Sequence, residues 1–236
     1  LEEHQFALEL QAQEIPIVAP SVINEKTLHT IDDYRFAVFP SVGGREFEVD
    51  NLDQLEWMGR FIGRIHNVTS TNAFQHRPPL NQTTHLDTPV ETLNASTLIP
   101  DTLKTAFFAI LEPLVNATKD RYVDFANIRL HGDCHPGNIL WRDGPSFVDL
   151  DDCRMGPAIQ DLWMMLSGDR IQQQIQLDTL IEAYEEFHEF DTAQLALIEP
   201  LRAMRMVHYM AWTSDRWQEP GLPQTVPWLG GRQKRG

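Results

Sequence analysis

One stretch of the sequence, HGDCHPGNILWRDGPSFVDLDD, constrains the fold and chemistry of this chain more than any other. It runs from His131 to Asp152 and places five aspartates around two short apolar segments, Asn138–Trp141 and Ser146–Leu150, whose composition predicts the strands of a hairpin. Buried carboxylates are costly unless they are paired or bind a cation. The stretch therefore predicts a hairpin that carries a cation site.

Three side chains of this stretch have the chemistry of a metal-assisted phosphoryl transfer site. Asp133 supplies a carboxylate, Asn138 supplies an amide oxygen, and Asp149 supplies a second carboxylate after the hairpin. Oxygen ligands of this kind suit Mg²⁺, which prefers one or two carboxylates together with substrate phosphates and water. Phosphoryl transfer uses a carboxylate to orient the attacking hydroxyl, and an Asn and an Asp to hold metal ions on the phosphates.

Composition narrows the possible partners and the compartment. With 236 residues and 42% hydrophobic content the chain can bury a substantial core, while its net charge of -15 argues against nucleic acid or an anionic membrane as the main partner. No apolar run reaches the length of a membrane span, and no signal peptide is visible. The two cysteines, Cys134 and Cys153, lie inside the acidic stretch, which favours free thiols in a reducing cytosol. We expect a cytoplasmic monomer.

Hydrophobic spacing and turn residues divide the rest of the chain into elements. Helical patterns run from Leu1 to Leu10, from Asp50 or Asn51 to about His66, from Asp101 to Lys119, and through most of residues 161–217. Two prolines predict an extended connection over residues 15–20, and Arg35–Phe39 has the composition of a buried strand that leaves through the loop Pro40–Gly44. Residues 69–100 are polar and contain proline, which predicts a long loop with short helical pieces.

The chemistry-bearing residues also resemble a known family. The HGDxxxxN element followed by a strand and Asp149 resembles the aminoglycoside phosphotransferase and choline kinase superfamily. Together with that element, FAVFPSVGGREFE, QDLWMML and IEAYEEFHEFDTA resemble the bacterial stress response kinase A family over nearly the whole chain.

The resemblance implies an α+β protein kinase-like fold with a mostly helical C-terminal lobe and a catalytic-loop hairpin. Residues 1–42 would be a remnant of the N-terminal nucleotide lobe with the hinge, and residues 43–236 the helical catalytic and substrate lobe. The family's glycine-rich loop and lysine strand would precede Leu1, so we expect the nucleotide lobe to be only partly present.

The resemblance also implies roles for individual residues of the predicted site. Asp133 would be the catalytic base, Asn138 a Mg²⁺ ligand, and Asp149 the Mg²⁺ ligand that corresponds to the aspartate of the kinase DFG motif. His131 would hold the loop through its ring. Asp161 would bind catalytic-loop amides from the start of a helix, although an ordinary helix N-cap is an alternative.

On the nucleotide side, the resemblance places Glu3 as the helix glutamate that pairs with the nucleotide-binding lysine, with neighbouring Glu2 as the alternative register. A strand that ends in proline and glycine offers free backbone groups at a lobe boundary. The resemblance implies that a hinge there receives adenine, formed by Phe39, Pro40, Ser41 and Val42.

The predicted function is ATP-dependent phosphoryl transfer that uses Mg²⁺. Resemblance to stress response kinase A implies a Ser/Thr protein kinase of the bacterial stress response, while the wider superfamily includes small-molecule kinases for aminoglycosides, choline and homoserine. The sequence alone does not choose between a protein and a small-molecule hydroxyl acceptor.

Two other classes of protein remain as alternatives. The spacing of His131, Asp133 and His135 also occurs in metal-dependent phosphoesterases, and a catalytically inactive kinase-like binding module would share the fold.

The roles of several further residues are left open. Asp151 and Asp152 are candidates for a second metal, for substrate contact or for a solvated turn, and three tryptophans are candidates for a substrate groove or for the helical core, namely Trp212, Trp217 and Trp228.

Overall fold

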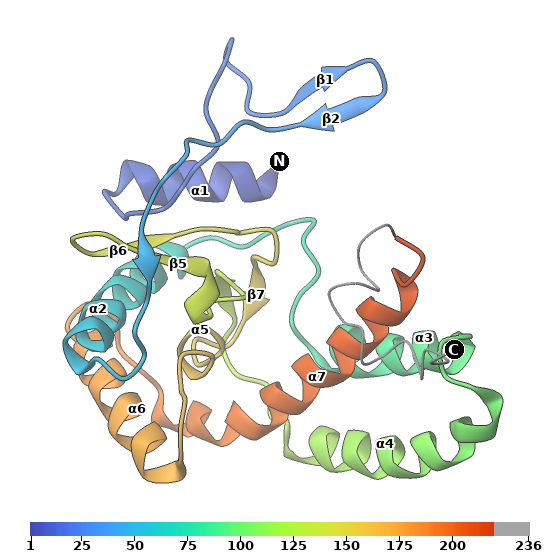
Figure 1. Cartoon of the computed structure of the whole chain (residues 1–236). Helices are drawn as coiled ribbons and strands as arrows, with labels where there is room; N and C mark the ends of the chain where they lie inside the picture. Colours follow the sequence, from blue (N-terminus) through green and yellow to red (C-terminus); the bar gives the residue numbers. More distant parts are fainter. Residues whose placement is uncertain (220–236) are drawn as a thin grey trace, which may run out of the picture. The chain divides into compact units, whose positions relative to one another are not determined.

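The computed structural model describes residues 1–219 of the chain (Figure 1). Two compact units can be separated by their internal contacts. The first contains residues Leu1–Pro79 and Phe125–Leu195, and the second contains Leu80–Asp124 and, among the described residues, 196–219. The predicted division between residues 1–42 and 43–236 concerns catalytic lobes rather than compact units, so it stays a prediction.

The first unit begins with the predicted helix, α1 (Glu2–Ala12). The chain then extends along one strand of the hairpin, as the two prolines predicted. Phe147 donates its N–H to the carbonyl of Pro16 (2.8 Å), and Val18 donates its N–H to the carbonyl of Phe147 (2.9 Å). A proline lacks an N–H but keeps its acceptor, so Pro16 can take part in this ladder. The contact places the segment after α1 beside the hairpin (Figure 1).

Short antiparallel strands form the remaining sheet structure of the first unit. The strands are β1 (His29–Ile31), β2 (Tyr34–Phe36), β3 (Arg45–Glu46), β4 (Ile128–Leu130), β5 (Ile139–Trp141), β6 (Pro145–Phe147) and β7 (Arg154–Gly156). β1 pairs with β2, β5 lies between β3 and β6, and β4 pairs with β7. The predicted hairpin is therefore β5–β6, but its second strand ends at Phe147 rather than Leu150.

The predicted buried strand Arg35–Phe39 is wrong in both extent and burial. Strand β2 ends at Phe36, and the side chains of Phe36 and Phe39 are 38% and 47% exposed. The sheet that holds β2 is the two-stranded hairpin β1–β2. Such a hairpin has no second layer to cover its apolar residues, so a strand-like composition does not lead to burial.

Helix α2 (Leu52–Thr69) forms as the hydrophobic spacing predicted, three residues longer at its C-terminal end. Asn51 is its N-cap, and its side-chain oxygen accepts the N–H of Gln54 (3.2 Å). This bond satisfies one of the amides that a helix N-terminus leaves without an internal partner. Of the two predicted cap candidates, Asp50 and Asn51, the structure selects Asn51.

Two glycines allow α2 to pack closely against α6 (Arg170–Tyr184). A Cβ on Gly59 would lie 2.4 Å from the carbonyl oxygen of Leu180, and a Cβ on Gly63 would lie 2.5 Å from that of Tyr184. Any larger residue would therefore push the two helices apart. This close packing matters for the site, because the same end of α2 carries His66, which contacts the aspartate that holds the catalytic loop, Asp161.

The other helical elements of the described chain are η1 (Thr83–Asp87), α3 (Thr88–Ala95), α4 (Asp101–Arg121), η2 (Pro136–Asn138), α5 (Gln160–Trp163), η3 (Thr192–Leu197) and α7 (Ile198–Asp215). In the second unit, α7 packs against α3 and α4. Residues 83–95, within the predicted long loop, form a continuous helical stretch. Pro89 lies in the first turn of α3, directly after η1.

A partly buried ion pair joins α1 to β4 within the first unit. The guanidinium of Arg129, whose side chain is 7% exposed, binds the carboxylate of Glu9 through two nitrogens at 2.6 and 2.9 Å. The same guanidinium lies 5.1 Å from the ring centre of Phe6 and 5.8 Å from that of Phe74. Hydrogen bonding to Arg129 lowers the pKa of Glu9 below its usual value.

Replacing Glu9 with Gln should make the stability of the protein less dependent on pH. Because the pKa of Glu9 is lower in the folded state, its contribution is present above the unfolded pKa and is lost as pH falls through the folded pKa. We expect Glu9→Gln to reduce the free energy of unfolding by roughly 1 kcal/mol at pH 7, a modest loss because Glu9 is partly exposed. The difference should shrink below pH 4. Urea unfolding at pH 7 and at pH 3 measures the difference in stability between Glu9→Gln and the unchanged protein.

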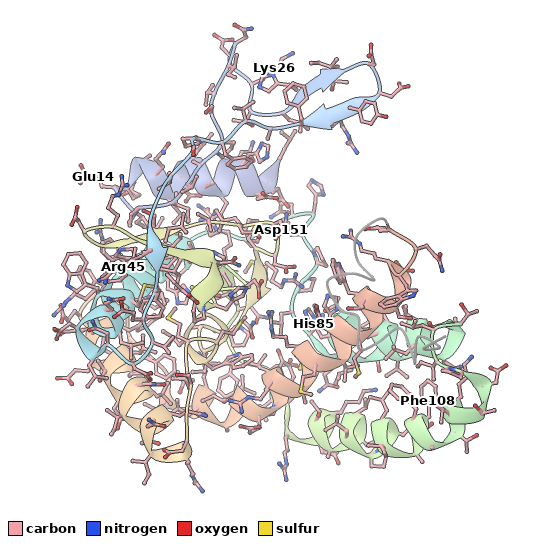
Figure 2. All side chains as sticks on the ribbon, in the orientation of Figure 1. Glu14, Lys26, Arg45, His85, Phe108 and Asp151 are labelled. Atoms are coloured by element: carbon pink, nitrogen blue, oxygen red, sulfur yellow. The ribbon has the colours of Figure 1, made fainter. Side chains whose placement is uncertain are left out.

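Glu14→Gln is the matched control, because Glu14 is an exposed acid just beyond α1 (labelled in Figure 2). A loss of stability in Glu9→Gln that is as large at pH 3 as at pH 7 would contradict the ion-pair explanation.

Candidate active site

The catalytic-loop stretch turns sharply as it leaves β4. Gly132 has a φ of +87°, and a Cβ at this position would lie 2.2 Å from the carbonyl oxygen of Asp152. Both the positive φ and the close approach require glycine here. The turn brings Asp133 next to the chain that leads into β7.

A buried aspartate holds this turn, as the family resemblance implied. The carboxylate of Asp161, 1% exposed, accepts the backbone N–H of His131 (2.8 Å) and that of Gly132 (2.9 Å). His66 of α2 lies 3.1 Å from the same carboxylate through Nε2, and its Nδ1 lies 2.9 Å from the hydroxyl of Tyr184. The predicted hydrogen bonds of Asp161 are present. Sequence reasoning missed His66, because nothing in its helical surroundings marks it.

The ring of His131 links the catalytic loop to the segment that precedes Asp149. Its Nε2 lies 3.0 Å from the carbonyl oxygen of Val148, and the ring is buried. This contact agrees with the predicted loop-holding role. The other ring nitrogen, Nδ1, is buried and has no hydrogen-bond partner among the described residues. The phosphoesterase alternative needs His131, Asp133 and His135 as metal ligands, but in residues 1–219 no group of three such side chains is arranged to hold a metal ion.

Asp133 and Asn138 lie side by side in the loop. The amide nitrogen of Asn138 donates to the backbone carbonyl of Asp133 (3.0 Å) and lies 3.4 Å from its carboxylate. His135 also approaches that carboxylate, at 3.4 Å, and the side chain of Asp133 is 18% exposed. Because the nitrogen of the Asn138 amide is used within the loop, its oxygen is the atom that could bind a cation.

Asp149 leaves the hairpin in a left-handed conformation, with a φ of +64°. Its carboxylate meets that of Asp151 (labelled in Figure 2). Burial raises the pKa of Asp151 to about 6, helped by the hydrogen bond and the negative charge of Asp149. Two carboxyl groups in contact are the arrangement that a divalent cation would stabilise. Sequence reasoning had left Asp151 with several possible roles.

These donors fit Mg²⁺ better than a metal held by protein ligands alone. In residues 1–219, no group of three or more His, Cys, Asp or Glu side chains is arranged to hold a metal ion. Mg²⁺ needs fewer protein ligands, because substrate phosphates and water complete its shell. The residues that could hold it are Asn138, through its amide oxygen, and Asp149, with Asp151 beside it.

A cavity of about 480 Å³ brings separate parts of the first unit together. Its acidic residues are Glu3, Asp149 and Asp151, and its wall is largely apolar, with Ala7, Val18, Pro20, Leu140, Val148 and Leu150 among the lining residues. Asn138 connects the catalytic loop to this cavity, because its carbonyl accepts the N–H of Val148 (3.0 Å).

Three of the four predicted hinge residues line the same cavity. They are Phe39, Pro40 and Val42, whereas Ser41 is not among the lining residues. The chain here is held to the segment after α1, since Ser21 donates its N–H to the carbonyl of Val38 (2.7 Å).

The two predicted acids of α1 have different surroundings. Glu3 lines the cavity and lies 3.4 Å from Arg77, whereas Glu2 accepts backbone amides of residues 75–77. Arg77 is a second residue that sequence reasoning missed, because it lies in a polar loop with no motif.

The remaining predictions concern the cysteines, the membrane and the tryptophans. Cys134 and Cys153 are free thiols, as predicted, and both are buried. Burial raises the pKa of Cys153 to about 12 and that of Cys134 well above its usual value. Across residues 1–219, none of the helices combines the length and apolar character needed to cross a bilayer. Trp212 stacks on Tyr209 and is 38% exposed, while Trp228 lies outside the described residues.

Comparison with known proteins agrees with this geometry. Residues 1–198 match the Phosphotransferase enzyme family. Stress response kinase A of Escherichia coli O157:H7 is 55% identical over 232 residues, which are 98% of this chain and 71% of the relative. A protein of Salmonella typhimurium strain LT2 named serine/threonine protein kinase RdoA is 54% identical over 231 residues, 98% of this chain and 70% of the relative.

A solved structure shows the same fold at low sequence identity. The amicoumacin kinase in complex with AMP-PNP, Ca²⁺ and Ami has a TM-score of 0.72 and is 17% identical, covering 97% of this chain and 75% of its own. This likeness confirms the predicted α+β, kinase-like fold class. The chain therefore belongs to the Phosphotransferase enzyme family and, within it, to the stress response kinase A group.

Proposed function

We propose that this chain forms the catalytic part of an ATP-dependent protein kinase that phosphorylates Ser or Thr hydroxyls. The observation that carries the proposal is the cavity. It gathers Glu3 of α1, the segment around Phe39 and Asp149 of the hairpin exit, which are far apart in the sequence. The resemblance implied that Glu3 is the helix glutamate that pairs with the nucleotide-binding lysine, that the segment around Phe39 receives adenine, and that Asp149 binds the metal.

The two ends of the cavity suit the two ends of a nucleotide. Apolar side chains such as Val18 and Leu140 would enclose the base, while backbone groups near Phe39 would bind its polar edge. The acidic end, with Asp149, would face the triphosphate. Because ATP is itself an anion, this end requires a cation between the carboxylates and the phosphates.

Mg²⁺ would be bound by Asn138 and Asp149 and would neutralise charge on the phosphate oxygens. The protein's own contribution to the chemistry is the carboxylate of Asp133. The acceptor hydroxyl would form a bond to the γ-phosphorus as the bond to the bridging β–γ oxygen breaks. ADP would leave with the electron pair of that bond, and the hydroxyl proton would pass to Asp133.

The choice of acceptor rests on the relatives. One relative is named a serine/threonine protein kinase, which supports a protein acceptor. The amicoumacin kinase supports the second candidate, a small-molecule hydroxyl. A transfer assay with labelled ATP, comparing protein acceptors with aminoglycosides, choline and homoserine, decides between them. Label only on a small molecule would overturn the protein-kinase proposal, and no transfer to any acceptor would overturn kinase function.

Asp133→Asn should remove most of the activity while the protein stays folded. The amide keeps the shape of the side chain but cannot accept the hydroxyl proton, so we expect the turnover number to fall by roughly 10²–10⁴-fold. Steady-state kinetics of the natural full-length protein measures the loss, and circular dichroism checks the fold.

Asp143→Asn is the matched control, because Asp143 is an exposed aspartate in the turn of the nearby β5–β6 hairpin. If Asp133→Asn turned over ATP as fast as this control, Asp133 would not be the base.

Asp149→Asn should weaken binding of Mg·ATP more than binding of adenosine. Asparagine tolerates the left-handed conformation of this position, so the change mainly removes charge. We expect the dissociation constant of Mg·ATP to rise roughly 10–100-fold, and that of adenosine to stay within about twofold, because only the phosphates need the metal. Isothermal titration calorimetry measures both. Asp143→Asn again serves as the control, since Asp143 also has a positive φ (+55°). Equal weakening of the two ligands would count against a metal-binding role.

A further inference from the structure

Arg77 makes contacts with two segments that the proposed reaction must keep aligned. Its Nε donates to the carbonyl of Cys153, and its Nη2 donates to the carbonyl of Asp151. Its Nη1 lies 3.4 Å from the carboxylate of Glu3 on α1. One guanidinium therefore joins α1 to the chain that follows Asp149.

The backbone around Arg77 is attached to α1 by a second set of contacts. The carboxylate of Glu2 accepts the N–H groups of Gln75 (2.6 Å), His76 (2.9 Å) and Arg77 (3.1 Å). Consecutive amides that point at one carboxylate form an anion-binding concavity, which favours the charged form of Glu2. These contacts fix the loop that carries Arg77 to the first turn of α1, independently of the contacts that the Arg77 side chain makes.

We propose that Arg77 is a positioning residue that clamps α1 to residues 151–153 and so sets the place of Glu3 and Asp149 in the cavity. This inference rests on the proposed kinase function. Nothing in the sequence pattern assigns a role to Arg77, and the contacts just described come from a loop that is distant in sequence from both segments.

The shape and charge of arginine both matter for this role. A guanidinium is planar and has donors that point in fixed, different directions, so it can bind two carbonyls and a carboxylate at once. A lysine has a single ammonium on a flexible chain and cannot hold all three in a defined geometry. The two carbonyls carry no net charge, so they do not neutralise the positive charge of Arg77. This charge therefore also offsets the repulsion among Glu3, Asp149 and Asp151, which line one cavity.

The link to catalysis is geometric. Asp149 lies two residues before Asp151, so a shift of the clamped backbone moves the carboxylate that faces the phosphates. A misplacement of about 1 Å at a reacting centre can lower a rate by about 100-fold. Arg77 itself is not expected to touch ATP.

Hydrogen–deuterium exchange of the ligand-free protein tests the proposed contacts of Arg77 independently of catalytic activity. We expect Arg77→Met to increase exchange at residues 1–6 and at residues 150–154 by about tenfold or more, while α6 stays as protected as in the unchanged protein. Arg60→Met is the matched control. Arg60 also bridges two groups, Glu56 at 2.5 Å and Glu186 at 2.9 Å, but it links α2 to the chain after α6 and does not line the cavity.

Kinetics of the natural full-length protein tests the consequence. We expect Arg77→Met to lower the turnover number by about 10–100-fold and to raise the Mg²⁺ concentration needed for half-maximal rate, with adenosine binding within about twofold. Arg77→Lys keeps the charge but not the planar, branched guanidinium, so it should bind adenosine like the unchanged protein and recover the turnover number only in part. A purely structural role would change the urea midpoint and leave the kinetics of the folded fraction intact.

Each result decides one part of the proposal. Unchanged exchange at both segments in Arg77→Met would overturn the clamp, and normal kinetics with increased exchange would overturn its positioning role. If Arg77→Met failed to fold, Arg77→Lys would decide, and full activity in that variant would overturn the need for the guanidinium. If the unchanged protein transferred no phosphate, the proposed function would fail, and exchange alone would still support or overturn the clamp.

Discussion

The candidate site depends on one buried carboxylate. Asp161 accepts two consecutive amides of the catalytic loop and is itself approached by His66, with almost no exposure to solvent. A buried carboxylate is stable only when its acceptors are filled, and buried amides are stable only when they have partners. The loop and the helical core therefore satisfy each other. These two hydrogen bonds determine the position of Asp133, because Asp133 directly follows His131 and Gly132, whose amides are bound.

The second constraint is the concentration of negative charge at the cavity. Glu3, Asp149 and Asp151 line the same space, and burial raises the pKa of Asp151, helped by its contact with Asp149. Arg77 lies at the edge of this group and binds Glu3. Such a site gains stability from a cation and from a substrate that brings one. The acidic residues of the cavity are thus explained by the cation that the proposed reaction needs.

Sequence alone determined much of the secondary structure and the identity of the main chemical groups. The helix after Asn51 was predictable because its cap and its apolar spacing are local signals, and the β5–β6 hairpin because its turn residues adjoin apolar runs. The candidate site residues Asp133, Asn138 and Asp149 were named from sequence, because their spacing reflects the loop and hairpin that carry them, and their catalytic and metal-binding roles stay predictions. Burial of Arg35–Phe39 was not predictable in this way, because burial depends on a covering layer that is not encoded beside the strand.

Only the tertiary structure decided which distant groups meet. His66 and Arg77 reach the site from α2 and from the loop after it, and no local pattern distinguishes them from ordinary polar residues. The register of Glu2 and Glu3 was likewise open until the structure placed Glu3 at the cavity and Glu2 on the amides of residues 75–77. Sequence spacing reports neighbours along the chain, so it determined the catalytic loop itself. The partners that hold this loop and α1 in place depend on how the chain packs, and packing joins residues that are far apart in sequence.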